Sequence, residues 1–409
     1  MILFKMSWRN VWRNKWRTVL TIGAICFGVS LMVWGFCLTD GSHEQIIRAS
    51  VEAFSGHLQI NRRGYHDDQR LRLGFVPDSS LYGLIESHKP AVTDYSARIT
   101  TFGLISVGET SFAGMLLGIE PEAEARFIHW DRKLEQGEYL DPADEYGALV
   151  GTDMAGNLGV SLGDTIIIVT QDYYGALTGG FRVVRGIFRS YAAELDRSAV
   201  LINLASAQHL LSMDKRVNTL VLMASNNEDV DPLKESLVSS LTDRDMEIKT
   251  WYEILPDLVQ FVELDSFFGA LTEMILVLVI GFMVLNTFLM SVMERIREFG
   301  VMRSLGASPG RVVVTIVLEA LLLTAVGLLI GNLIGLTASW INSIYPLDFS
   351  GMGEEVYKEY GMDPRIYALI NLKTVLVPNL LIIGVVILAL IYPAIRASRI
   401  KPVEALARR

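Results

Sequence analysis

One short sequence has the spacing of a serine nucleophile. Gly306-Ala-Ser-Pro-Gly310 matches the G-x-S-x-G pattern, in which a tight strand-to-helix turn presents a serine for attack on an ester or amide carbonyl. That chemistry needs a strand before the serine and a helix that continues from it. Here the pattern lies in a polar turn between two long apolar runs, and proline follows the serine. We therefore interpret the match as coincidental.

Other catalytic or ligand-binding patterns are missing from the sequence. It contains no G-x-x-x-x-G-K-[ST] loop for a nucleotide phosphate, and its six histidines have no metal-ligand spacing. The basic clusters are short and adjoin apolar runs, which does not favour nucleic-acid binding. We expect a chain that is not an enzyme, with no catalytic residue, no metal and no cofactor of its own.

Two carboxylates, Glu273 and Glu319, lie inside apolar runs. An ionisable side chain within a membrane is a functional hypothesis, for example a proton relay. Alternatively, each lies near a helix end and reaches headgroups or a cation such as Arg17 or Arg311. We favour this second interpretation because a relay needs a chain of polar partners. The roles of both residues stay open.

These residues lie among four apolar runs, each long enough to cross a bilayer, and 51% of the residues are hydrophobic. In the third run, Gly327, Gly331 and Gly335 form a ridge of small residues that permits close helix packing. The two cysteines lie in the first run and indicate no disulfide framework. The predicted membrane helices cover residues 18–40, 267–293, 309–340 and 374–395.

Charge is distributed unevenly along the chain. Residues 1–17, 294–311 and 396–409 together hold fourteen Lys/Arg and three Asp/Glu, whereas residues 41–266 hold nineteen basic and thirty-four acidic residues. The positive-inside rule therefore places both termini and the central turn in the cytoplasm and the acidic domain outside. Residues 1–17, rich in tryptophan and arginine, are predicted to form an interfacial helix. Residues 341–373 are a short outer loop, and residues 396–409 a cytoplasmic tail.

The outer domain, residues 41–266, mixes strand and helix patterns. Two strand–helix–strand segments, at 56–107 (with strands at 56–61 and 98–107) and at 217–250, enclose a β-rich stretch. The sequence predicts an α+β lobe with a β-rich lobe, about 108–215, inserted in it. Helical flanks at 41–51 and 251–265 would continue the membrane helices outward as stalks.

The turn between the second and third runs, residues 294–308, has a helical pattern of its own. Every third position in it is apolar, with charged residues between: Ile296, Phe299, Met302 and Leu305. Gly306 suits a helix stop, and Ser308 with Pro309 suits the start of the next helix. We expect a short amphipathic helix whose apolar face lacks a partner within this chain.

The sequence from Glu294 to Ala307, ERIREFGVMRSLGA, strongly resembles the turn of FtsX-like ABC permeases, and Tyr392 to Leu406 resembles that family's closing motif. The one-plus-three arrangement of spans is also similar. The segments SGHLQI, at residues 55–60, and GNLGVSLGD, at residues 156–164, resemble the lipoprotein-releasing (LolC/LolE) branch.

The resemblance implies a type VII (MacB-like) ABC architecture, with porter-like and sabre-like lobes in the outer domain. Two separate ATPase subunits would bind ATP and Mg, and a second permease, identical or homologous, would complete the complex in a bacterial inner membrane. Motion would pass from the ATPase to the outer domains by mechanotransmission, which releases lipoproteins or other amphiphiles. By the same resemblance, the ATPase-coupling residues are Glu294, Arg295, Arg297, Glu298, Phe299, Met302, Arg303 and Leu305.

In the lipoprotein branch, one permease recruits a soluble carrier through an outer hairpin, which here corresponds to residues 170–180. Asp172, Tyr173 and Tyr174 form the candidate partner loop. The hairpin lacks the proline and methionines expected of such a hook. A plain hairpin loop is the alternative, and we favour it slightly.

Two other functions remain as alternatives. An FtsX-like regulator would activate an outer hydrolase without transport, but the outer domain is large for that class. A MacB-like efflux component would carry a fused N-terminal ATPase, whereas this sequence begins with the membrane segment.

Overall fold

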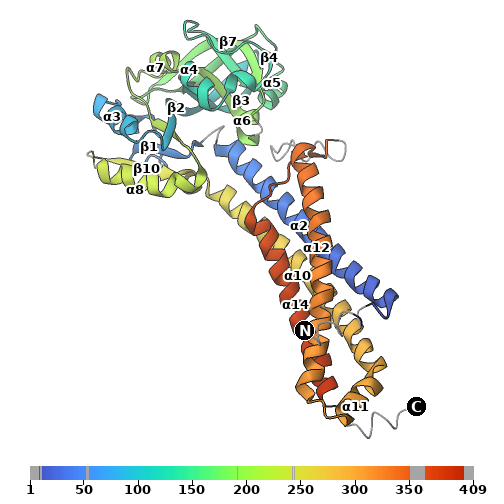
Figure 1. Cartoon of the computed structure of the whole chain (residues 1–409). Helices are drawn as coiled ribbons and strands as arrows, with labels where there is room; N and C mark the ends of the chain where they lie inside the picture. Colours follow the sequence, from blue (N-terminus) through green and yellow to red (C-terminus); the bar gives the residue numbers. More distant parts are fainter. Residues whose placement is uncertain are drawn as a thin grey trace. The chain divides into compact units, whose positions relative to one another are not determined.

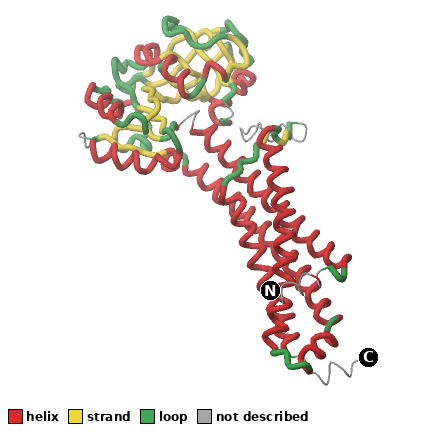
Figure 2. Tube along the Cα trace, in the orientation of Figure 1, coloured by secondary structure: helices red, strands yellow, loops and turns green. Residues whose placement is uncertain are grey.

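The computed structural model describes residues 9, 12–51, 55–190, 192–241, 243, 245–350 and 364–399. The chain divides into two compact units (Figure 1). The helical unit comprises Met1–Glu44, Val262–Asp348 and Arg365–Arg409, and the sheet unit comprises Gln45–Phe261 and Phe349–Pro364. In Figure 2 the helices are red and the strands are yellow, and the yellow ten-stranded sheet lies in the sheet unit.

The helical unit is built on four helices that are long and apolar enough to cross a membrane. Their bounds are α2 (Lys15–Ser50), α10 (Pro256–Glu294), α12 (Pro309–Ile344) and α14 (Leu372–Ser398). A short helix, α11 (Ile296–Ser304), joins α10 to α12, and a two-residue ladder pairs β11 (Leu347–Asp348) with β12 (Arg365–Ile366). Buried aliphatic residues from all four long helices form one core.

Local sequence explains how the chain turns between α11 and α12. Gly306 has a φ of +91°, which glycine adopts without steric cost. Around it, the backbone N–H of Ala307 donates to the carbonyl of Met302 at 3.0 Å. Ser308 is extended at the N-cap and Pro309 occupies the first turn of α12. The helix stop and start expected from the sequence are both present.

The sheet unit contains a ten-stranded mixed sheet in the order β10-β1-β9-β2-β3-β8-β5-β7-β4, with β6 paired to β2 and β7. The strands are β1 (Leu58–Arg62), β2 (Val92–Val107), β3 (Thr110–Ile119), β4 (Leu134–Gly137), β5 (Gly147–Gly151), β6 (Thr165–Gln171), β7 (Leu177–Phe188), β8 (Ala199–Asn203), β9 (Thr219–Ala224) and β10 (Met246–Thr250). The helices are α3 (Ser79–Ser87), α4 (Pro121–Phe127), α5 (Thr152–Leu158), α6 (Ala193–Ser198), α7 (Leu204–Leu210), α8 (Val230–Ser240) and α9 (Trp251–Ile254), with one-turn 3-10 helices η2 (Leu71–Leu73), η3 (Trp130–Arg132) and η4 (Asn227–Asp229).

Strand β2 belongs to both halves of this sheet. Its first half pairs with β9, from Val92 to Arg98, and its second half pairs with β6, from Gly103 to Ser106. Separate hydrophobic clusters lie on either side of this division. The strands within residues 108–215 are therefore attached through β2, which runs about six residues further toward the N-terminus than the strand expected at 98–107.

The predicted fold class is confirmed, because four long apolar helices accompany an α+β domain. Most of the interfacial helix expected at 1–17 lies outside the described residues, and residues 12–14 form a turn and a bend before α2. Helix α14 continues to Ser398, and the remainder of the expected tail after Arg399 also lies outside the described residues.

Candidate coupling site

Helix α11 turns part of its apolar face inward. Phe299 is only 1% exposed and belongs to the core of the helical unit, and Met302 packs partly against that core. This corrects the expectation that the apolar face lacks a partner within the chain, because Phe299 is buried in a core to which all four long helices contribute. The exposed side of α11 instead presents Arg297, Val301 and Leu305, and Leu305 is 83% exposed.

Arg295 links α11 to α12 through a buried ion pair. Its Nη1 donates to Oε2 of Glu319 at 2.7 Å, and the two side chains are 8% and 11% exposed. The Nε of Arg295 also donates to Glu298 at 3.1 Å, and its guanidinium lies over the Phe299 ring. Glu319 therefore pairs with Arg295, and neither Arg17 nor Arg311, the cations suggested by the sequence, is its partner in the described residues.

Glu298 extends the same chain of charges to the start of α2. Arg13 lies 2.7 Å from Oε1 of Glu298. Burial alone would raise the pKa of Glu298, but hydrogen bonds from Arg13 and Arg295 outweigh it and lower the pKa. Glu298 is therefore ionised at neutral pH, and Arg13–Glu298–Arg295–Glu319 forms one continuous series of ion pairs.

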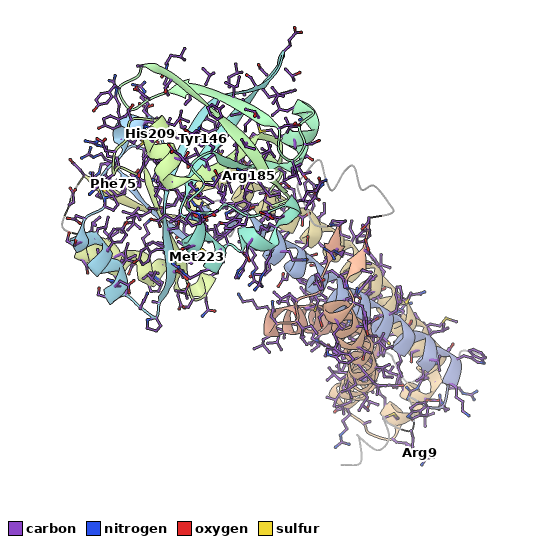
Figure 3. All side chains as sticks on the ribbon, turned by 90° about the horizontal axis from the view of Figure 1, so that it is seen from above. Arg9, Phe75, Tyr146, Arg185, His209 and Met223 are labelled. Carbon is purple, nitrogen blue, oxygen red and sulfur yellow. The ribbon has the colours of Figure 1, made fainter. Side chains whose placement is uncertain are left out.

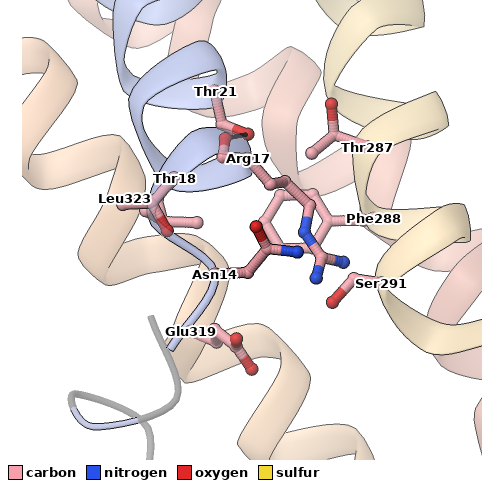
Figure 4. A pocket seen from close by; sticks show the side chains of 9 residues that line it. All are labelled: Asn14, Arg17, Thr18, Thr21, Thr287, Phe288, Ser291, Glu319 and Leu323. Atoms are coloured by element: carbon pink, nitrogen blue, oxygen red, sulfur yellow. Dashed lines mark hydrogen bonds between the residues drawn. The ribbon is translucent and has the colours of Figure 1, made fainter. Parts of the chain in front are cut away.

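A second pair joins α2 directly to the end of α10. The Nη2 of Arg17 donates to Oε2 of Glu294 at 2.8 Å. Arg17 also lines a small polar cavity of about 20 Å³ with hydroxyls from both helices, among them Thr21, Thr287 and Ser291. In Figure 4 the guanidinium extends from α2 toward α10, and Glu319 enters the same cavity from α12. Room of this size suits about one water molecule.

Arg303 connects the last turn of α11 to α14. Its Nη1 donates to the main-chain carbonyl of Ser398 at 3.0 Å. Ser398 is the final residue of α14. With the ion pairs above, α11 is therefore joined by charged side chains to the turn before α2, to α12 and to α14.

The glycine ridge of α12 lies against α2. A Cβ at Gly331 would lie 2.8 Å from the carbonyl oxygen of Cys26 and 2.9 Å from Cβ of Val29. Gly327 and Gly335 approach Ile25 and Ser30 in the same manner. Because both backbones meet at these positions, α2 and α12 are held in direct contact.

The candidate partner loop is a well-packed turn between β6 and β7. Asp172 accepts hydrogen bonds from the backbone N–H groups of Tyr174 and Ala176. Tyr173 packs against the neighbouring core with Arg216 over its ring, whereas Tyr174 is 66% exposed. Of the three predicted residues, Tyr174 is thus the one whose side chain extends into solvent.

Nothing around Ser308 resembles a nucleophile elbow. Ser308 is the N-cap of α12 and follows α11 instead of a strand. Within the described ranges, no group of three or more His, Cys, Asp or Glu could hold a metal ion.

The sequence analysis missed Arg13 and Arg17 as partners of the turn. Their pairs connect residues more than 270 positions apart, so no local spacing could reveal them. One signal was available: residues 1–17 are basic, and the otherwise basic turn contains two acidic residues, Glu294 and Glu298.

Comparisons with known proteins agree with this architecture. Residues 273–402 match the family described as FtsX-like permease C-terminal, and residues 18–240 match that described as MacB-like periplasmic core domain. The lipoprotein-releasing system transmembrane protein LolC of Xylella fastidiosa is 23% identical over 403 residues, which cover 94% of this chain and 92% of LolC. The macrolide export ATP-binding/permease protein MacB of Hyphomonas neptunium is 26% identical over 421 residues, covering 98% of this chain and 60% of MacB. The crystal structure of the periplasmic region of MacB from Actinobacillus actinomycetemcomitans aligns with 53% of this chain and 98% of that region, at 16% identity and a TM-score of 0.35.

Proposed function

The chain belongs to the ABC transporter permeases of the FtsX/MacB type, and from that premise we propose that it couples ATP hydrolysis by a separate ATPase subunit to motion of its outer domain. It is a multi-pass membrane protein with a large periplasmic domain. In the proposed orientation, the protein spans the inner membrane of a bacterial cell, with α11 and both termini on the cytoplasmic side.

The observation that carries this proposal is the set of charged contacts made by α11. A coupling element must offer one face to the ATPase and be fastened on the other to the helices that it moves. Exposed Arg297, Val301 and Leu305 provide the first face. Buried Arg295, with Glu319 on α12, provides the fastening, because a buried ion pair is costly to break.

The stalks receive the motion in this mechanism. The Arg17–Glu294 pair joins the N-terminal end of α2 to the C-terminal end of α10. These two helices continue from the helical unit into the sheet unit. A displacement of α11 would therefore reach both connections at once. No substrate needs to pass between the helices.

The remaining components follow from the family. An ABC permease of this type implies an ATPase partner. We propose two ATPase copies, which bind ATP and Mg, and a second permease that is either identical or homologous. The role of this chain is mechanical, without a catalytic step of its own.

We further propose that the complex releases lipoproteins or other amphiphiles from the membrane. The similarity to LolC supports this substrate class, because it extends over almost the whole of both chains. A periplasmic carrier or a lipoprotein would then contact the outer domain, with Tyr174 as the exposed residue of the partner loop. Efflux of another substrate is the second candidate, favoured by the match to MacB over 98% of this chain.

The test is reconstitution with the proposed ATPase and second permease. Purified complex in proteoliposomes that contain an acylated lipoprotein should release that protein in the presence of ATP and Mg, and not with a non-hydrolysable analogue. A complex that hydrolyses ATP and retains the lipoprotein, but extrudes a small amphiphile, would replace the first candidate by the second. Absence of a stable ATPase complex would overturn the coupling proposal itself.

A further inference from the structure

A cleft in the sheet unit lies where the β6–β7 turn meets α3 and the start of β10. Its volume is about 590 Å³, within the range of sites that hold drug-sized ligands. Phe75, labelled in Figure 3, lies in its lining together with Leu81 and Met246, and all three are largely buried. Leu84 and Leu241 extend this apolar part of the lining.

Two arginines at the cleft retain unused hydrogen-bonding capacity. Within the described residues, the side chain of Arg62 makes no ion pair and no hydrogen bond, although it lines the cleft. The guanidinium of Arg216 lies 4.8 Å from the centre of the Tyr173 ring. Its one carboxylate partner among the residues described is the largely exposed Asp214, with 3.4 Å between Nη1 and Oδ2. That distance is long for an arginine–carboxylate pair. Both guanidinium groups can therefore donate hydrogen bonds to an anionic ligand.

The two acidic residues of the lining are committed to local structure. Asp78 is the N-cap of α3 and accepts hydrogen bonds from the Leu81 N–H and the Ser80 hydroxyl. Asp243 accepts from the backbone N–H of Asp245. Among the charged groups of the cleft, the two guanidinium groups therefore retain the most hydrogen-bonding capacity, although the domain around them is strongly acidic.

From this arrangement we infer that the cleft binds a carboxylate-bearing, apolar segment of a partner polypeptide. Arginine recognises carboxylates through paired N–H donors, and the apolar lining offers a place for one or two side chains beside the carboxylate. An acyl chain would require a continuous apolar channel, whereas serine hydroxyls and aspartates interrupt this lining. Alternating polar and apolar groups suit a peptide.

The segment would contact both halves of the domain. Arg62 ends β1 on one side of β2, and Tyr173 belongs to the turn of the β6–β7 hairpin on the other. A bound segment would hold the hairpin against the α3 end of the domain. This role does not depend on the coupling site, so it can be tested without an ATPase.

The full chain in lipid nanodiscs is titrated into a fluorescein-labelled hexapeptide of alternating leucine and glutamate, and anisotropy is recorded. We expect saturable binding that weakens by about tenfold in Arg62→Gln and in Arg216→Gln, the loss of one good ion pair. Arg62→Lys keeps the charge and should lose less than Arg62→Gln. Arg63→Gln is the matched control, since Arg63 neighbours Arg62 but does not line the cleft, and its affinity should match that of the unchanged protein.

Three outcomes would overturn the inference. The first is equal affinity for a hexapeptide of alternating leucine and glutamine. The second is equal weakening by Arg63→Gln, which would show that only the net charge matters. The third is absence of saturable peptide binding while fluorescein-labelled dodecanoate binds and loses affinity in Arg62→Gln, which would assign the cleft to an anionic amphiphile. Failure of the ATPase coupling experiments leaves these results unaffected.

Discussion

Arg295 and Glu319 form an ion pair with a separation of 2.7 Å, and each side chain is about nine-tenths buried. The pair joins Arg295, the N-cap residue of α11, to Glu319, about three turns into α12. Removing two charges from water is expensive, and the attraction between them offsets that cost only while both are present. The stability of the helical unit should therefore depend on the pair as a unit.

Breaking one side of this pair should destabilise the helical unit strongly. Arg295→Met leaves the Glu319 carboxylate without its partner, and Glu319→Leu leaves Arg295 with only the more exposed Glu298, so each should lose stability, by up to about 3–5 kcal/mol. The double replacement should recover most of this loss, because no buried charge remains. Thermal unfolding in detergent measures all three variants. Arg13→Gln, which removes an exposed pair with Glu298, should change stability by less than about 1 kcal/mol. A double variant no more stable than either single variant would contradict this explanation.

Leu305 and Phe299 should respond differently to the same substitution. Leu305→Asp alters an exposed side chain and should weaken binding of the ATPase by at least about 2 kcal/mol, with unchanged thermal stability. Phe299→Asp should lower thermal stability, since it places a carboxylate in the core. Pull-down of the ATPase and thermal unfolding separate these effects. Leu372→Asp is the control, because Leu372 is also exposed but begins α14 at a different site. Full ATPase recovery with Leu305→Asp would remove Leu305 from the interface.

The elements of the fold were largely predictable because their determinants are local. Apolar runs of bilayer length identify the spanning helices, and Gly306 with Pro309 identifies the turn at the end of α11. Alternation identified most strands. It did not reveal the first half of β2, because residues 93–96 are polar or partly exposed and their pairing with β9 depends on a distant part of the chain.

The candidate site was only partly predictable. The threefold spacing placed α11 correctly, but Phe299, Met302 and Leu305 are all apolar, and only their neighbours decide which one is buried. The partners of Arg295 and Arg17 come from other helices. Such pairing is a property of tertiary packing, which no single-sequence pattern contains.

Gly331 should tolerate no side chain. In Gly331→Ala the new Cβ would lie within 3 Å of both Cys26 and Val29, so α2 and α12 must separate. Overpacking of this kind costs about 1–3 kcal/mol, and the melting temperature in detergent should fall. Gly384→Ala in α14 is the matched change, since no atom lies within 4 Å of its added Cβ. It should be neutral or slightly stabilising, because alanine favours helix. Equal effects at both glycines would argue against the α2–α12 contact.

His66 should make the outer domain less stable in mild acid. Burial, followed by the charge of Lys249, lowers the pKa of His66 from 6.5 to about 4, while Asp67 and Glu253 oppose the shift. Its ring Nε2 pairs with Oδ1 of Asn61 at 2.9 Å. Between pH 6.5 and 4, the unfolded chain takes up a proton that the folded domain does not. The contribution of neutral His66 to stability is therefore complete above pH 6.5, decreases as the pH falls toward 4, and changes no further below that.

Urea unfolding of a fragment covering residues 42–265, followed by tryptophan fluorescence from pH 7.5 to 4, measures this dependence. His66→Gln can still donate to Asn61 through its amide but has no proton to gain, so its curve should be flatter than that of the unchanged fragment over this window. The control His209→Gln replaces a histidine whose side chain is 83% exposed and should keep the original slope. Because carboxylates also titrate toward pH 4, the informative quantity is the difference between the His66→Gln and unchanged curves. If that difference is constant across the window, His66 is protonated equally in the folded and unfolded states, and its burial does not set the acid sensitivity of the domain.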